Sequence, residues 1–190
     1  MNKRNHAAQN ANIHPVYFKR LYHSPIGLLT LYATESALVE IDFEKSRYYG
    51  PAAQAGGKEE ERLPILMEAS RWLDRYFAGE KPESHELPLA PAGSAFRQEV
   101  WERLRQIPYG ETTTYGAIAK CLPFPRMSAQ AVGGAVGHNP ISIIIPCHRV
   151  VGSNRSLTGF GGGIQTKIWL LTHEGLDMEQ FIIPTKGTAL

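Results

Sequence analysis

The chain has 190 residues, 43% of them hydrophobic, and a formal net charge of +2 at pH 7, which allows one good hydrophobic core or two small ones. Because it has no run of about 18 apolar residues and no apolar segment behind its basic N-terminus, we expect neither a transmembrane helix nor a secretory signal. Two cysteines without a signal argue against a disulfide framework, so we expect a cytoplasmic protein in a reducing compartment.

The first half of the chain predicts a small N-terminal α/β domain made of antiparallel strands and one helix. Three strand-like runs separated by turn residues indicate an antiparallel meander; they span Val16 to Tyr22, Gly27 to Tyr32 and Ala37 to Phe43. Residues 46–61 have no period and indicate a loop. Apolar residues at helical spacing then predict a helix from Leu63 to Phe77, with Gly79 as its C-terminal stop.

The second half predicts a mostly helical C-terminal domain behind a proline-rich linker, Lys81 to Gly93. Three of its helices begin at residues that favour the N-cap position; these are Ser94, then Thr113 or Thr114, then Ser128. We expect the two domains over residues 15–90 and 91–178, a flexible tail over 1–14 and a C-terminal tail over 179–190.

A short helix, a tight turn and a helix of small residues, Ala129 to about Val136, indicate a helix-turn-helix. An ordinary helix pair and a DNA-binding unit fit this pattern equally well. Gly133 and Gly134 offer no side chains for reading base edges, so sequence-specific readout in the major groove is not expected. From Ala95 to Glu174 the chain has eight Lys or Arg against four Asp or Glu, which permits a polyanionic partner without requiring one.

A continuous apolar run from Pro140 to Pro146 stands immediately before Cys147 and His148. Its β-branched residues predict a strand buried on both faces, and Pro146 ends that strand because proline has no N–H to donate. A thiol at such a strand end is either a small buried hydrophobe or a nucleophile, and buried cysteines are common. The run alone leaves both interpretations open.

A glycine-rich segment, Thr158 to Gly163, and a last helix follow Cys147. The glycines fit neither a Walker A motif nor a dinucleotide fingerprint, so they predict a flexible loop that lines a pocket. Apolar residues from Ile164 to Leu171 predict the last helix, with Gly175 as its C-cap. Glu174 lies at the end of this helix, where the macrodipole disfavours a carboxylate, so it is either simply solvated or held there for a function.

The segment Pro146 to Val150 (Pro-Cys-His-Arg-Val), with Asn139-Pro140 before it and His173-Glu174-Gly175 after it, resembles the methylated-DNA–protein-cysteine methyltransferases. The likeness runs from about Ser94 to Gly175. It implies that the chain repairs guanine alkylated on its exocyclic oxygen by moving the alkyl group to its own Cys147, each chain acting once. O4-alkylthymine is a candidate second substrate.

The chemistry of the motif agrees with this resemblance. A thiolate suits displacement at a saturated carbon, but a free cysteine is mostly protonated near neutral pH and needs a base. Neighbours in an extended chain point in opposite directions, so we expect a water between Cys147 and His148. The resemblance implies the same relay from Cys147 through water to His148 and Glu174, with Asn139 bracing the active-site turn.

The alkylated oxygen is hidden in the duplex, so the nucleotide must be flipped out. The resemblance implies that the small-residue helix enters the minor groove, that Tyr115 rotates the nucleotide and donates to the guanine ring, and that the loop around Phe160 walls the pocket. The residues expected to contact substrate or DNA are Thr114, Tyr115, Gln130, Ala131, Gly133, Val150, Phe160, Gly161 and Lys167. Many family members carry an arginine at position 130, so we expect Gln130 to fill the stack with modestly weaker binding.

The resemblance also implies double-stranded DNA as the partner, and we expect a monomer without a cofactor or membrane contact. We expect no metal ion, because the sequence shows no convincing ligand cluster. Two alternatives remain, a damage-binding helix-turn-helix protein without chemistry and a thiol hydrolase. Related non-catalytic proteins lack the motif cysteine, whereas Cys147 is present, and nothing beyond the Cys/His pair fits a hydrolase. We expect Cys121, on the helix before Pro123, to be a packed structural thiol.

Overall fold

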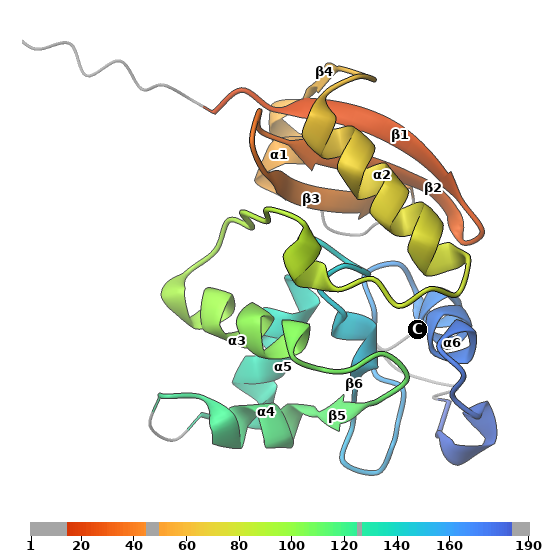
Figure 1. Ribbon diagram of the computed structural model, residues 1–190. Coiled ribbons are helices and arrows are strands. Elements are labelled where there is room, and N and C mark those ends of the chain that lie inside the picture. Colours follow the sequence, from red (N-terminus) through yellow and green to blue (C-terminus); the bar gives the residue numbers. More distant parts are fainter. Residues whose placement is uncertain (1–14, 45–49, 125–126, 184–190) are drawn as a thin grey trace, which may run out of the picture.

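The computed structural model describes residues 15–44, 50–124 and 127–183 (Figure 1). Its first half contains a four-stranded sheet in the order β3-β2-β1-β4. The strands are β1 (Phe18–Ser24), β2 (Gly27–Ala33), β3 (Leu38–Phe43) and β4 (Lys58–Glu59). The first three form the predicted antiparallel meander, and β4 pairs parallel with β1. The predicted tail over 1–14 lies outside the described residues.

Helix α2 (Pro64–Phe77) lies across the sheet in Figure 1 and buries its apolar face against it. The predicted loop over 46–61 is partly wrong, because it contains α1 (Pro51–Ala55) and β4; residues 45–49 lie outside the described part. The buried Glu40 carboxylate accepts the N–H groups of Gly50 and Ala52 at 2.6 and 3.0 Å, which holds the start of α1. No local sequence pattern predicts this contact between Glu40 and Gly50, which are ten residues apart.

In the part of the second half that the structure describes, four further α-helices lie below the sheet in Figure 1. They are α3 (Ala95–Arg105), α4 (Tyr115–Cys121), α5 (Ala129–Gly137) and α6 (Ile164–His173). Ser94, Thr114 and Ser128 cap the first three as predicted, each accepting a backbone N–H three residues on. The short strands β5 (Thr113–Thr114) and β6 (Val150–Val151) pair parallel, and short 3₁₀ helices span η1 (Ser84–Glu86), η2 (Cys147–Arg149) and η3 (Met178–Gln180).

One hydrophobic cluster runs through both halves of the molecule. The predicted linker is part of this joint, because Leu38 on β3 exchanges backbone hydrogen bonds with Pro88 and Ala90 at 2.9 and 2.8 Å. At the other end of β3, the N–H of Ile41 donates to the carbonyl of Pro140 at 2.8 Å. The sheet is therefore bonded directly to the segment that leads to Cys147.

The predicted fold class, a small sheet domain followed by a mostly helical one, is confirmed. The tail predicted over 179–190 is wrong in its first residues, since Ile182 exchanges backbone hydrogen bonds with Arg155 and Leu157; residues 184–190 lie outside the described part. Within the described ranges, no helix is long and apolar enough to cross a membrane.

Candidate active site

The apolar run before Cys147 is a buried turn, so the predicted strand is wrong. Residues 141–145 form isolated bridges around a turn, and the N–H of Ile145 donates to the carbonyl of Ile141 at 2.9 Å. Asn139 closes this turn, because its amide donates to Ile145 O at 2.8 Å and its oxygen accepts from Ile141 N at 3.1 Å. Ile143 has a φ of 75°, a conformation that costs a β-branched residue energy and that clusters at functional sites.

Cys147 begins the 3₁₀ helix η2 directly after this turn and is 6% exposed. Burial raises the pKa of its thiol above the ordinary value, while Asn139, the Lys167 charge and Ser142 act in the opposite direction. The hydroxyl of Ser142 lies 4.0 Å from Sγ. The thiol therefore sits in an enclosed position in which its ionisation depends on a few named neighbours.

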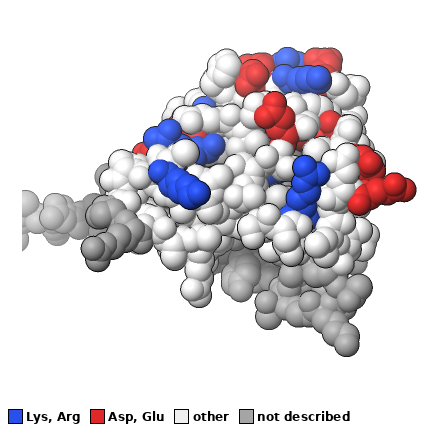
Figure 2. Space-filling model, turned by 90° about the horizontal axis from the view of Figure 1, so that it is seen from below, with Lys and Arg blue, Asp and Glu red and all other residues white. Residues whose placement is uncertain are grey.

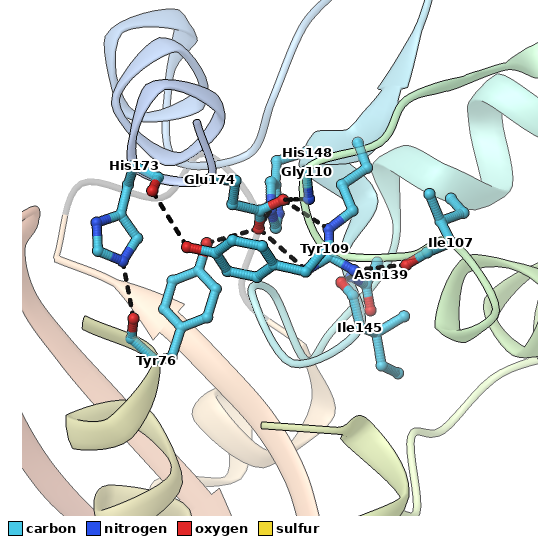
Figure 3. A network of polar contacts seen from close by, with 10 residues as sticks. Tyr76, Ile107, Tyr109, Gly110, Asn139, Ile145, His148, His173 and Glu174 are labelled. Carbon is cyan, nitrogen blue, oxygen red and sulfur yellow. Dashed lines mark hydrogen bonds and ion pairs between the residues drawn. The ribbon is translucent and has the colours of Figure 1, made fainter. Parts of the chain in front are cut away.

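His148 is fully buried beside Cys147, and its Nε2 lies 2.7 Å from Oε1 of Glu174 (Figure 3). Its other ring nitrogen, Nδ1, has no hydrogen-bond partner among the described residues. Burial lowers the pKa of His148, and the bond with Glu174 partly offsets this. Because residues of a 3₁₀ helix diverge by about 120°, the Cys147 thiol and the imidazole do not bond directly within the described structure.

Glu174 is the hub of the polar network drawn in Figure 3. Besides His148, its carboxylate accepts from Arg149 through Nε at 2.9 Å and Nη2 at 3.0 Å, and from Gly110 N at 3.1 Å. Burial alone would raise its pKa, but the bonds and charges of His148 and Arg149 outweigh this and lower the pKa to about 2. The predicted alternative of a simply solvated Glu174 is therefore wrong, and the unfavourable helix position is offset by a guanidinium.

Three partners of Glu174 were not among the predicted site residues: the backbone N–H of Gly110 and the side chains of Arg149 and Tyr76. Arg149 lies inside the motif directly after His148, and this place in the sequence could have identified it. Tyr76 lies 98 residues earlier, on α2, and its hydroxyl donates to Glu174 Oε1 at 2.8 Å. No spacing in the sequence predicts the contact between Tyr76 and Glu174.

The residues expected to line the substrate pocket surround Cys147 from several elements. Strand β5 pairs with β6, with Thr113 opposite Val150 and Thr114 opposite Val151, so Tyr115 follows directly after this pairing. The Tyr115 hydroxyl lies 2.5 Å from Thr158 Oγ1. The Phe160 ring meets the His148 imidazole edge to face at 6.4 Å between centroids, and also packs on Phe43 of the sheet.

Lys167 does not occupy the surface position expected of a DNA contact. It is 1% exposed, and its ammonium donates to the carbonyls of Val150 and Thr158 at 2.6 and 3.1 Å. Burial lowers its pKa to about 8, although the nearby Cys147 raises it again in part. The side chain thus joins the segment after Cys147 to the glycine-rich loop.

The remaining predicted DNA contacts lie on or near α5, where Gln130 is exposed and Ala131 is half-buried. A Cβ added to Gly133 would touch the Tyr115 ring at 3.7 Å, so α4 and α5 are close there, whereas Gly134 faces open space. Figure 2 views the molecule from below and shows this lower face as mostly uncharged, with separate basic and acidic side chains. Gly161 is exposed at the edge of the loop. Cys121, predicted to be packed, is an exposed free thiol.

Among the described residues, no group of three or more His, Cys, Asp or Glu side chains could hold a metal ion.

Comparison with known proteins gives two family models that divide the chain between them. Residues 17–91 match the ribonuclease-like domain of 6-O-methylguanine DNA methyltransferase, and residues 95–176 match its DNA-binding domain. The methylated-DNA–protein-cysteine methyltransferase of Haemophilus influenzae is 45% identical over 80% of this chain and 83% of its own length. The chain belongs to this family. The resemblance seen in the motifs is thereby confirmed over both halves of the molecule.

Other relatives agree in sequence and in structure. The enzyme of the same name from Methanosarcina acetivorans is 44% identical over 82% of this chain and 96% of its own. The crystal structure of Mycobacterium tuberculosis O6-methylguanine methyltransferase superposes with a TM-score of 0.74 at 42% identity, covering 84% of this chain and 93% of that one. A structure of Mycobacterium tuberculosis OGT in complex with DNA gives a TM-score of 0.76 at 40% identity, covering 86% and 94%.

Proposed function

We propose that this protein repairs DNA by moving the alkyl group of O6-alkylguanine to Cys147, once per chain. The observation that carries the proposal is the buried pair of His148 and Glu174 beside a single enclosed thiol, inside a chain of this family. O4-alkylthymine is a second candidate substrate. The names of the relatives, as methylated-DNA–protein-cysteine methyltransferases, support this reaction class.

The proposed step is a displacement at the saturated carbon of the alkyl group. The sulfur–carbon bond forms as the carbon–oxygen bond breaks, and the electron pair of that bond goes to the guanine. The thiol proton passes through a water to Nδ1 of His148, which is buried and without a partner among the described residues. Glu174 then stabilises the imidazolium through Nε2 at 2.7 Å, as a buried carboxylate does in other nucleophile–histidine–carboxylate sites.

The leaving guanine, which receives the electron pair, needs a hydrogen-bond donor and a fixed position. Tyr115 supports this role, because its half-buried hydroxyl lies beside Thr158 at the pocket and burial raises its pKa, so it stays protonated at neutral pH. Phe160 packs against His148 and supports the role of a pocket wall. Lys167 acts indirectly in this proposal, by holding the loop and by favouring the Cys147 thiolate.

The proposed DNA-binding mode places α5 of the predicted helix-turn-helix in the minor groove of a duplex with the damaged base flipped out. The absence of side chains at Gly133 and the open space at Gly134 support a close approach of this helix. Exposed Gln130 at its first turn is placed to fill the gap in the stack. Shape-reading binding of this kind suits a protein that inspects any sequence.

The proposal includes a monomer of two domains, 15–90 and 91–178, that acts in the cytoplasm. The proposal needs no second chain, because Tyr76, His148 and Glu174 form their network within one chain. The family models end and begin at residues 91 and 95, which supports the domain division. Both cysteines are free, as the chemistry requires, and a reducing compartment keeps them so.

The test is the loss of O6-methylguanine from a synthetic duplex incubated with the protein. We expect wild type and Cys121→Ala to remove the lesion equally and Cys147→Ala to remove none while still binding the duplex. Lesion removal by Cys147→Ala would defeat the proposal. An intact lesion after incubation with wild type would leave the damage-binding alternative.

A further inference from the structure

The Glu174 oxygen that holds His148 is shared with a residue from the first half of the chain. The Tyr76 hydroxyl donates to Oε1 at 2.8 Å, and the same oxygen accepts from His148 Nε2 at 2.7 Å and from Arg149 Nη2 at 3.0 Å (Figure 3). Tyr76 is 1% exposed and the Glu174 side chain is fully buried. In such an enclosed place, hydrogen bonds to a charged group are strong.

The position of Tyr76 is fixed by contacts that do not involve Glu174. Its ring stacks on Trp72 at 5.7 Å between centroids, and it meets Tyr109 edge to face at 6.0 Å. Its carbonyl accepts from His173 Nε2 at 2.8 Å, one residue before Glu174. Helix α2 is therefore attached to the end of α6 by two hydrogen bonds from a single residue.

The hydroxyl of Tyr76 is a permanent hydrogen-bond donor to the carboxylate of Glu174. Burial and the Glu174 charge raise the pKa of Tyr76 far above its ordinary value, so it remains protonated. A donor on Oε1 stabilises the negative charge there and weakens the attraction of Glu174 for a proton on His148. Removing the donor makes the carboxylate a stronger partner for the imidazolium.

We propose that Tyr76 is a positioning residue for the alkyl transfer, supplied by the N-terminal half, which holds Glu174 in place and keeps His148 neutral and ready to accept a proton. This inference rests on the proposed function. It assigns the sheet domain a part in the chemistry, in addition to its part in the fold.

The test compares Tyr76→Phe with Tyr109→Phe in single-turnover methyl transfer measured across pH. Both variants remove one hydroxyl from the same aromatic cluster, but Tyr109 donates to the His173 carbonyl and not to Glu174. We expect the acidic limb of the Tyr76→Phe rate profile to move up by about one pH unit, the scale of one charge-assisted hydrogen bond. A merely structural loss would lower the rate equally at all pH values, and that result would overturn the proposal.

A second variant covers the case in which Tyr76→Phe does not fold. Site-specific 3-fluorotyrosine at position 76 keeps the shape and makes the hydroxyl a stronger donor, so the acidic limb moves to lower pH. In a ¹⁵N NMR titration without DNA, we expect the pKa of the His148 ring to rise in Tyr76→Phe and to fall with 3-fluorotyrosine at position 76. If wild type transfers no methyl group, the proposed function fails, whereas unchanged His148 titrations with active wild type defeat this inference alone.

Discussion

At the scale of single residues, the reactivity of the site depends on how a buried thiol is ionised. Burial raises the pKa of Cys147, which works against a thiolate. The charge of Lys167 acts in the opposite direction and lowers the pKa of Cys147. Two backbone carbonyls hold the ammonium of Lys167 in place. Since burial lowers the pKa of Lys167 to about 8, it is mostly charged at pH 7. A fixed buried cation of this kind is one of the ways in which proteins activate cysteine.

We expect Lys167→Met to raise the pKa of Cys147, because the variant removes that charge and keeps a side chain of similar length. The measurement is the pH dependence of Cys147 alkylation by iodoacetamide, followed by peptide mass. Lys120→Met, which removes an exposed lysine from α4, is the control and is expected to leave the midpoint in place. DNA affinity is expected to change little. A large loss of affinity with an unchanged midpoint would show that Lys167 acts on DNA.

The sequence predicts the residues of this site only as far as they lie in motifs. Cys147, His148, Glu174 and Asn139 are recognisable because each stands in a short run that resembles a family. Tyr76 is not, because its contact with Glu174 depends on how α2 crosses the interface between the halves. The burial of Lys167 is equally hidden, since a lysine at that spacing also fits an exposed helix face.

At the scale of elements, the segment before Cys147 has a pattern that predicts its burial but not its secondary structure. A continuous apolar run predicts burial, and residues 141–145 are buried. It does not distinguish a strand from a buried turn, because both hide their side chains. The Asn139 side chain favours the turn, because it bonds the Ile145 carbonyl and the Ile141 N–H, which a neighbouring strand would otherwise bond.

Helix α5 carries the prediction about DNA affinity. We expect Gln130→Arg to bind the duplex more tightly, because a cation adds attraction to phosphates at a position that is already exposed. The slope of log Kd against log salt concentration should steepen by about one. Met67→Arg, on α2 in the other half, adds the same charge and is the control. If both variants change affinity alike, or neither does, Gln130 does not lie at the DNA.

At the scale of the whole molecule, the two halves share one core and meet at the site. The sequence predicts two units of the correct kind and most of the helix starts, because caps and periodicity are local. It does not predict their joint, where Ile41 pairs with Pro140 and Phe43 packs on Phe160. These contacts join residues that are far apart along the chain.

Asp42 lies between Ile41 and Phe43, two sheet residues that contact the second half, and it gives a prediction about stability. Burial, together with the neighbouring Glu40, raises the pKa of Asp42 from 3.8 to about 7, and one Asp42 oxygen has no hydrogen-bond partner among the described residues. The fold therefore keeps a proton that the unfolded chain releases above about pH 4, so stability is lost as the pH rises from 4 to 7. Asp42→Asn cannot titrate and should be more stable than wild type at pH 8, by roughly 2–4 kcal/mol.

Urea unfolding at pH 4 and pH 8 measures this difference. At pH 4 wild type and Asp42→Asn should have closely similar free energies of unfolding, and the difference between them should grow towards pH 8. Glu35→Gln, at an exposed turn, is the control and should show no such opening. A wild type that gains stability over Asp42→Asn as the pH rises would contradict the proposed burial of a protonated carboxyl.

The central claim is that Cys147 is the acceptor of the alkyl group, and peptide mass mapping tests it most directly. The protein is incubated under reducing conditions with excess duplex containing O6-methylguanine, digested, and the Cys147 and Cys121 peptides are quantified over time. The account predicts one added methyl group on Cys147, rising to one per chain and stopping there, with Cys121 unmodified. An unmodified Cys147 in protein that has removed the lesion would contradict it.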